Sequence, residues 1–141
     1  MTPAVEVLLT EDSLFFTPLS GKFDVEAVAA AIAGIGFSYR DEVEPSAFAI
    51  FSREEDRDAC RAARRADPTS TFPYVLLVTV RPSVAVVFPV ASQEDLRVLS
   101  VQFLEWLMAN YECRIENEFG TDMALVTRPL EIPAEGSQPS T

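Results

Sequence analysis

The chain has 141 residues, of which 48% are hydrophobic and 23% charged, which is the size and composition of one ordinary globular domain. It contains no histidine, and 22 acidic against 11 basic residues give a formal net charge of −11. The absence of histidine excludes Ser-His and Cys-His nucleophile activation and histidine-ligated zinc, and the negative charge disfavours nucleic acid and anionic membrane surfaces as partners.

The first half of the chain is predicted to form a hairpin, a helix and a second hairpin. Two short apolar runs, residues 5–10 and 14–17, flank a polar turn and therefore predict a hairpin. Asp24 is placed to cap a helix that ends near Gly36, and apolar residues between them recur at helical spacing. Alternating hydrophobicity then predicts the two strands of the second hairpin, residues 37–42 and 47–51.

Two further helices are predicted from capping patterns. Ser52 and Glu55 match a capping box, which predicts a helix up to about Ala66. A second pattern of this type begins at Ser92 and predicts the longest helix of the chain, up to about Tyr111.

The remaining strands are predicted between and after these helices. Residues 74–80 and 84–88 form a third hairpin that is apolar on both faces. This pattern is typical of strands covered on both sides, or covered by helices on one side and by a partner on the other. Residues 113–118 alternate as a strand, residues 123–127 are expected to pair back on it, and from Pro129 onward the polar composition predicts a disordered tail.

The predicted order is ββα three times over, closed by one or two more strands. It predicts an α+β fold with a mainly antiparallel sheet and three helices packed on it. A single domain of residues 1–128 would precede the disordered polar tail of residues 129–141. The sequence contains no phosphate-binding glycine loop, dinucleotide fingerprint, nucleophile elbow or zinc-protease motif. We therefore expect no metal and no cofactor.

The cysteines and the N-terminal sequence indicate the cellular compartment in which we expect the protein. Cys60 and Cys113 lie far apart and outside any C-x-x-C pattern, so we expect two free, buried thiols. The N-terminus lacks a charged segment followed by an apolar one, and the apolar runs are interrupted, which predicts neither a signal peptide nor a membrane span. We expect a cytoplasmic protein, and the excess of arginine over the single Lys22 is associated with a bacterial source.

The helix predicted from Ser52 has two contrasting faces. At 3.6 residues per turn its arginines fall within an arc of about 120° opposite a face of alanines, so we expect the arginines to share the solvent side. Such a stripe can dock a phosphate or a carboxylate-rich partner. A solvated face with ion pairs to Glu54 and Asp58 also explains it, and we favour that interpretation. The arginines are Arg53, Arg57, Arg61, Arg64 and Arg65, and the alanines are Ala59, Ala62, Ala63 and Ala66.

Carboxylates gather around the last predicted strand. Alternation places Glu116 and Glu118 on one face, about 7 Å apart along the strand. Two neighbouring carboxylates can divide acid and base roles or hold a hard cation. We favour a simpler interpretation, an exposed strand that its charges protect from pairing. If the cluster has a function, binding a cationic partner fits it better than catalysis. The candidate residues are Glu112, Glu116, Glu118 and Asp122.

The longest helix and the third hairpin carry more apolar residues than a one-sided element requires. Packing in the core of the monomer is the explanation we favour, and an oligomer or partner interface is the alternative. The residues concerned are Val98, Val101 and Met108 on the helix and Val84, Val86 and Phe88 on the hairpin.

Two classes of function remain. The hypothesis we adopt is a non-catalytic bacterial protein-binding module that acts through an acidic surface, as an immunity-type inhibitor or a secretion-type chaperone or adaptor does. By charge, we expect its partner to be a basic protein and not nucleic acid or a membrane. The sequence leaves a homodimer open. The candidate binding surfaces are the acidic cluster and the arginine stripe. The alternative is a small-molecule enzyme that uses carboxylates, which requires a concave pocket around Glu116, Glu118 and Asp122.

Overall fold

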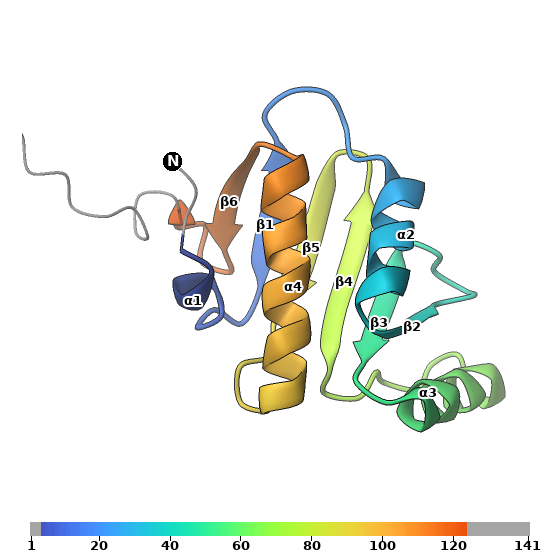
Figure 1. Ribbon diagram of the computed structural model, residues 1–141. Coiled ribbons are helices and arrows are strands. Elements are labelled where there is room, and N and C mark those ends of the chain that lie inside the picture. Colours follow the sequence, from blue (N-terminus) through green and yellow to red (C-terminus); the bar gives the residue numbers. More distant parts are fainter. Residues whose placement is uncertain (1–3, 124–141) are drawn as a thin grey trace, which may run out of the picture.

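In the computed structural model, which describes residues 4–123, the chain folds around one antiparallel sheet of six strands (Figure 1). The strands lie in the order β2-β3-β4-β5-β1-β6, and all neighbouring pairs are antiparallel. The strands are β1 (Leu14–Pro18), β2 (Phe37–Arg40), β3 (Ala47–Phe51), β4 (Leu76–Arg81), β5 (Val84–Phe88) and β6 (Cys113–Asn117). The helices within these residues are α1 (Val5–Leu8), α2 (Val25–Ile35), α3 (Glu54–Ala66) and α4 (Glu94–Asn110). The fold is therefore α+β, as the sequence predicts.

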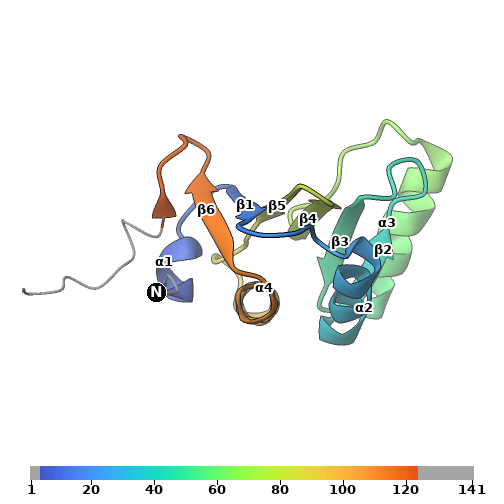
Figure 2. The ribbon, with the colours of Figure 1, turned by 90° about the horizontal axis from the view of Figure 1, so that it is seen from above.

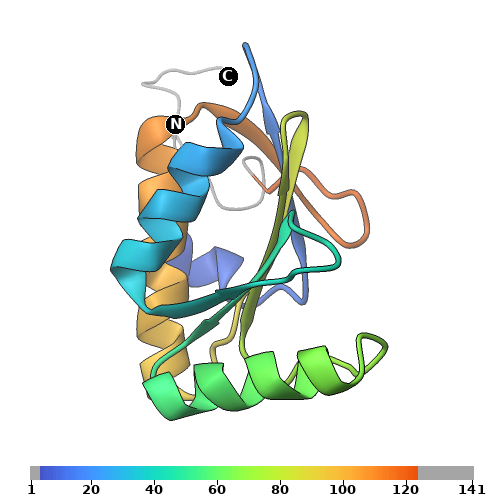
Figure 3. The same cartoon turned by 90° about the vertical axis from the view of Figure 1, so that its right-hand side faces the viewer.

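The helices cover the two faces of the sheet unequally. α2 and α4 lie side by side on one face, which we call the inner face (Figure 2). α3 contacts β2 and β3 from the opposite, outer face and lies across one end of the sheet (Figure 3). Within residues 4–123, the outer face of β1 and β5 is left without a packed helix.

The main core lies between the inner face and the helices α2 and α4. Inward side chains of the central strands are buried there against apolar side chains of both helices. Burial contributes about 1.5–3 kcal/mol for each large aliphatic or aromatic side chain, so most of the stability comes from this face. The strands supply Leu14, Phe16, Phe48, Ile50, Leu76, Val78, Val80, Ala85 and Val87, and the helices supply Val28, Ile32, Phe103, Leu104 and Leu107. A smaller cluster on the outer face joins Tyr39, Ala49 and Phe51 to Cys60 of α3.

Local signals place most elements correctly. α2 begins at the predicted cap, where the Asp24 carboxylate accepts a hydrogen bond from the Ala27 amide at 3.1 Å, and it ends at Gly36. The second and third predicted hairpins form as β2–β3 and β4–β5, and the last predicted strand forms as β6. These elements depend on contacts between residues that are close in sequence, so local sequence patterns are sufficient to predict them.

The predicted capping boxes of α3 and α4 do not form. Arg53 and Gln93 occupy the cap positions, and neither side chain makes a capping hydrogen bond. The Ser52 hydroxyl donates instead to the carboxylate of Asp95, in the first turn of α4. The side chain predicted to cap α3 therefore joins the start of α3 to the start of α4.

The predicted N-terminal hairpin does not form. Val5–Leu8 is one helical turn, α1, in which Leu8 is fully buried in the main core. β1 pairs with β5 on one side and with β6 on the other, so no edge of β1 is left for the N-terminal segment. The order ββα therefore holds only for the second and third units, and the described residues contain four helices rather than three.

Some predictions fall outside the described residues. The tail of residues 129–141 and the domain boundary before it lie outside them, as does the strand predicted over 123–127 apart from Met123. An isolated antiparallel bridge does join Glu116 to Asp122 just before that segment. Among the helices of residues 4–123, none has the length and apolar character needed to cross a membrane.

Gly36 and Gly34 provide a matched test of packing at the end of α2. A Cβ atom on Gly36 would lie 2.9 Å from the Phe51 carbonyl oxygen and 3.1 Å from a methyl group of Leu99, whereas a Cβ on Gly34 would meet nothing within 4 Å. We expect Gly36→Ala to lower the free energy of unfolding by about 1–3 kcal/mol, because it overpacks the site. Gly34→Ala should raise it by about 0.5 kcal/mol, because alanine is the better helix former. Urea denaturation measures both, and equal effects would contradict the close packing at Gly36.

Candidate functional site

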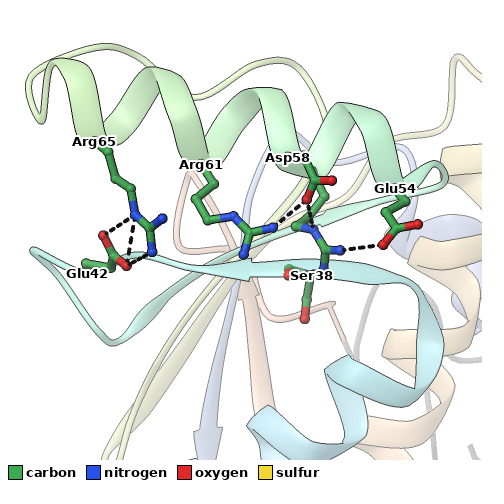
Figure 4. A network of polar contacts seen from close by, with 7 residues as sticks. Ser38, Glu42, Glu54, Asp58, Arg61 and Arg65 are labelled. Atoms are coloured by element: carbon green, nitrogen blue, oxygen red, sulfur yellow. Dashed lines mark hydrogen bonds and ion pairs between the residues drawn. The ribbon is translucent and has the colours of Figure 1, made fainter.

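Only part of the arginine stripe of α3 lies on the solvent side, which corrects the prediction that all five arginines share it. The side chains of Arg53 and Arg65 are 63% and 58% exposed. The side chains of Arg57 and Arg64 are only 22% and 11% exposed. Arg57 reaches the Ser38 carbonyl of β2, and Figure 4 shows Arg61 and Arg65 directed from α3 toward β2 and the turn after it. The opposite face is exposed throughout and carries Ala59, Ala62, Ala63 and Ala66.

Each arginine of the stripe has a carboxylate partner, which explains how this face can lie against the sheet. The favoured ion pairs within the helix form, from Arg57 to Glu54 at 3.2 Å and from Arg61 to Asp58. The other pairs are Arg53 with Asp56, Arg64 with Asp41 and Arg65 with Glu42. A hydrogen bond from Arg65 holds the pKa of Glu42 below its usual range. The stripe is therefore neutralised within the chain and is not a row of free cations.

The ion pair between Arg64 and Asp41 is the buried one. The Asp41 carboxylate, 2% exposed, accepts hydrogen bonds from Arg64 at 3.1 and 3.0 Å and from the Tyr39 hydroxyl at 3.1 Å. Arg64 also donates to the Ser70 carbonyl at 2.5 Å and lies over the Phe72 ring, 4.5 Å from its centre. One guanidinium therefore joins α3, the β2–β3 turn and the connection that leads to β4.

That connection forms a ridge beside a hollow in the surface. The ridge consists of Phe72, Pro73, Tyr74 and Val75, and the Tyr74 side chain is largely exposed. A hollow of about 510 Å³ separates the ridge from α3 and the start of α4, and we call it the helix hollow. Its other lining residues include Phe51, Ala59, Cys60, Ala63 and Leu96, together with the carboxylates of Asp56 and Asp95.

A second hollow lies against the ridge on the outer face of the sheet. It measures about 360 Å³ and is lined by Leu77 of β4, by Phe88 and Pro89 at the end of β5 and by Asp12 just before β1. We call it the strand hollow. The same four ridge residues line both hollows, so the ridge is a partition between them.

All charged residues that line the two hollows within residues 4–123 are acidic. Asp56 pairs with Arg53, and a hydrogen bond from Ser52 holds the pKa of Asp95 below its ordinary value. The Asp12 carboxylate makes neither an ion pair nor a hydrogen bond to another described residue. The two hollows therefore combine an apolar lining with negative charge at neutral pH.

The predicted acidic cluster of Glu112, Glu116, Glu118 and Asp122 is spread along β6 and the segments beside it. Glu116 pairs with Arg114 of the same strand at 3.0 Å. Neither hollow is lined by any of the four carboxylates, and no group of acidic or cysteine side chains in residues 4–123 is arranged to hold a metal ion. The Glu118 carboxylate accepts a hydrogen bond from the Ser13 amide at 3.3 Å, which places this end of the cluster beside the strand hollow.

The surplus apolar residues divide between the core and the surface. Val101 and Met108 of α4 pack against the core, as favoured from the sequence, whereas Val98 is exposed. On the hairpin, Val86 is half-buried and Phe88 is 43% exposed, and both lie on the outer face. Core packing therefore accounts for most of α4, and the outer face of the hairpin is the part left accessible to a partner.

Both cysteines are free thiols, as their spacing predicts, but only Cys60 is buried, whereas Cys113 is partly exposed. Burial raises the pKa of Cys113 to about 11 and also raises the pKa of Cys60, which lines the helix hollow. Both thiols are therefore protonated at neutral pH, and a protonated thiol is a poor nucleophile. The helix hollow does not contain an activated thiol for covalent catalysis.

Comparison with family models, with curated protein sequences and with solved structures finds no match for this chain. The fold and the site therefore define its class on their own. The protein is an α+β protein whose six-stranded antiparallel sheet is covered on its inner face and carries an apolar, acid-lined surface at one end.

Sequence patterns did not predict the ridge or the two hollows. The sequence does contain one signal for the ridge, which is Pro73 between the large side chains of Phe72 and Tyr74. Bulky apolar residues in a connection need a surface to pack on. The sequence places Asp12 only in the polar turn between residues 5–10 and 14–17. Its place beside Phe88 depends on the pairing of β1 with β5, and no local pattern indicates that pairing.

Asp41→Asn tests whether the buried pair stabilises this end of the sheet. Burial raises the pKa of the Asp41 carboxyl, but hydrogen bonds from Arg64, the Glu44 amide and Tyr39 hold it below its ordinary value of 3.8. Its contribution to stability is therefore present above about pH 4 and is lost as the pH falls through the folded-state pKa. We expect D41N to lower the free energy of unfolding by about 3 kcal/mol at neutral pH, because Arg64 stays buried without its counter-charge. The difference from wild type should shrink below about pH 4.

Glu42→Gln is the matched control for this variant. Glu42 is the neighbouring carboxylate and also pairs with an arginine of α3, but its side chain is 53% exposed. The substitution should lower stability much less than D41N does, because solvent screens an exposed ion pair. Chemical denaturation at a series of pH values measures both variants. A D41N effect as small as that of E42Q would show that the buried pair does not hold α3 in place.

Proposed function

We propose that the protein is a non-catalytic protein-binding module that binds a basic partner at the acidic end of its sheet. The observation that supports this most directly is the pair of hollows, which share an apolar lining and whose charged residues within the described part of the chain are all acidic. Apolar surface provides affinity when a partner covers it, and a negative rim attracts and orients a positively charged partner. The net charge of −11 acts in the same direction over a longer range.

Two bacterial roles are compatible with such a module. An immunity-type inhibitor would cover the basic active site of a toxin, and a secretion-type chaperone or adaptor would hold a segment of its partner in the cytoplasm. Both act by surface complementarity and need no catalytic group. The proposal covers either role, and the partner is a protein in both.

Other functions have less support. A carboxylate-dependent enzyme requires a concave pocket around Glu116, Glu118 and Asp122, and neither hollow is lined by these residues. A homodimer through the hollows would bring two acid-lined surfaces together, and like charges across an interface oppose association. We therefore propose neither of them for this surface.

Photo-crosslinking at defined positions tests the proposal. A benzophenone amino acid replaces Tyr74 on the ridge in one variant and Leu19 in the matched control. The two side chains are 66% and 67% exposed, but Leu19 follows β1, at the opposite end of that strand from Asp12. In lysate of the native cell, we expect the Tyr74 variant to form one discrete protein adduct and the Leu19 variant to form none. The adduct yield should fall when salt rises from about 0.1 M to about 1 M, which shortens the Debye length from about 10 Å to about 3 Å.

The outcomes separate the parts of the proposal. Adducts with many proteins, equal adducts from both positions or no adduct at either position would contradict a binding function at this end of the sheet. A discrete adduct at Tyr74 whose yield does not change with salt would retain the binding function but contradict the electrostatic basis assigned to it.

A further inference from the structure

The ridge between the two hollows restricts the shape of what can bind there. A flat protein surface would rest on the exposed Tyr74 and leave both hollows empty. An extended segment that crosses the ridge can fill both, because every second side chain of an extended chain points to the same side. The geometry therefore favours a single strand of polypeptide over a folded surface.

The distance across the site sets the length of such a segment. From Asp12, just before β1, to Phe88 of β5 and Leu77 of β4 there are two strand spacings, about 10 Å in all. α3 on the far side of the ridge adds about one helix diameter, a further 10 Å. A path of roughly 20 Å corresponds to about six extended residues at about 3.3 Å each.

Charge specifies the chemistry at the two ends of this path. Asp12 lies at the strand-hollow end and Asp95 at the helix-hollow end, where Asp56 is already paired with Arg53. The part between them is apolar and includes the exposed ring of Tyr74, whose face can accept a guanidinium or ammonium group. The matching ligand carries cations at both ends and apolar side chains between them.

We infer that the ridge and the two hollows bind an extended segment of a partner protein, about six residues long, with apolar side chains in the hollows and arginine or lysine at the carboxylates. The inference rests on the proposed function and specifies its ligand. It corresponds to the chaperone or adaptor role, because an inhibitor that covers a folded active site would not need two hollows. Residues 124–141 of the same chain contain two acidic residues and one arginine, so their charge does not match this site.

Selection from a displayed library of random peptides tests this inference. The peptides are about twelve residues long, twice the length that the surface accommodates, and the target is the full chain. We expect the enriched sequences to carry net positive charge with apolar residues at alternate positions. Enriched peptides are then synthesised with a fluorophore, and their Kd is measured by fluorescence polarisation against the wild type and four variants.

Two variants alter the site, and each has a matched control. Ala63→Trp fills the helix hollow, whereas Ala62→Trp makes the same change at the exposed neighbour that does not line it. Asp12→Arg reverses the charge at the strand hollow, whereas Glu105→Arg makes the same charge change at an exposed position of α4. We expect each site variant to weaken binding at least about tenfold and each control to change it by less than about twofold.

Each outcome decides the inference. Enriched peptides without excess positive charge, equal losses for Ala63→Trp and Ala62→Trp, or equal losses for Asp12→Arg and Glu105→Arg would overturn it, and so would a library that yields no binder. The crosslink at Tyr74 decides the proposed function separately, because an adduct there without any peptide binder means that a folded surface is recognised. Circular dichroism confirms the fold of every variant, and Ala59→Trp, which fills the same hollow, replaces Ala63→Trp if the latter does not fold.

Discussion

The buried ion pair between Asp41 and Arg64 is the interaction on which the acidic end of the sheet depends. A guanidinium offers several donors in one plane and a flat face. Arg64 uses the donors on the carboxylate in the β2–β3 turn and on the Ser70 carbonyl, and its face lies on the Phe72 ring. These contacts fix the last turns of α3 relative to the connection that follows. Because the ridge begins at Phe72, the shape of both hollows follows from this pair.

The same chemistry explains why α3 packs with Arg57 and Arg64 toward the sheet. The methylene groups of arginine cover apolar surface while the guanidinium finds acceptors at the edge. Arg57 illustrates this, since it lies over the Phe37 ring and bonds to the Ser38 carbonyl. An alanine face turned inward would bury little area and leave these carboxylates and carbonyls without donors. The alanines therefore face outward, and the small side chains of Ala59 and Ala63 leave the space that forms the helix hollow.

Much of the fold was predictable because the deciding contacts are local. The Asp24 cap of α2 and the hairpins β2–β3 and β4–β5 join residues close in sequence. The sequence wrongly predicts a strand for the N-terminal segment, because its apolar residues fit a strand as well as a helical turn. The strand does not form because β5 and β6 already pair with the two edges of β1. The site was not predictable residue by residue, since Asp12, Ala63 and Tyr74 come from three separate segments. Composition indicates an acidic protein but does not locate its charge: the acidic surface predicted around the last strand lines neither hollow.

Charge also acts on any contact between the apolar outer faces of two copies. A sheet face with exposed Phe88 and no packed helix would favour pairing of two copies. Each copy carries a net charge of −11, and a contact through the hollows would place acid-lined surfaces against one another. This repulsion acts within about 8 Å at physiological ionic strength, which is the range in which such a contact forms. On the proposed function, the same carboxylates would attract a cationic segment, so that charge would discriminate between a second copy and a partner while the apolar lining would supply the binding energy.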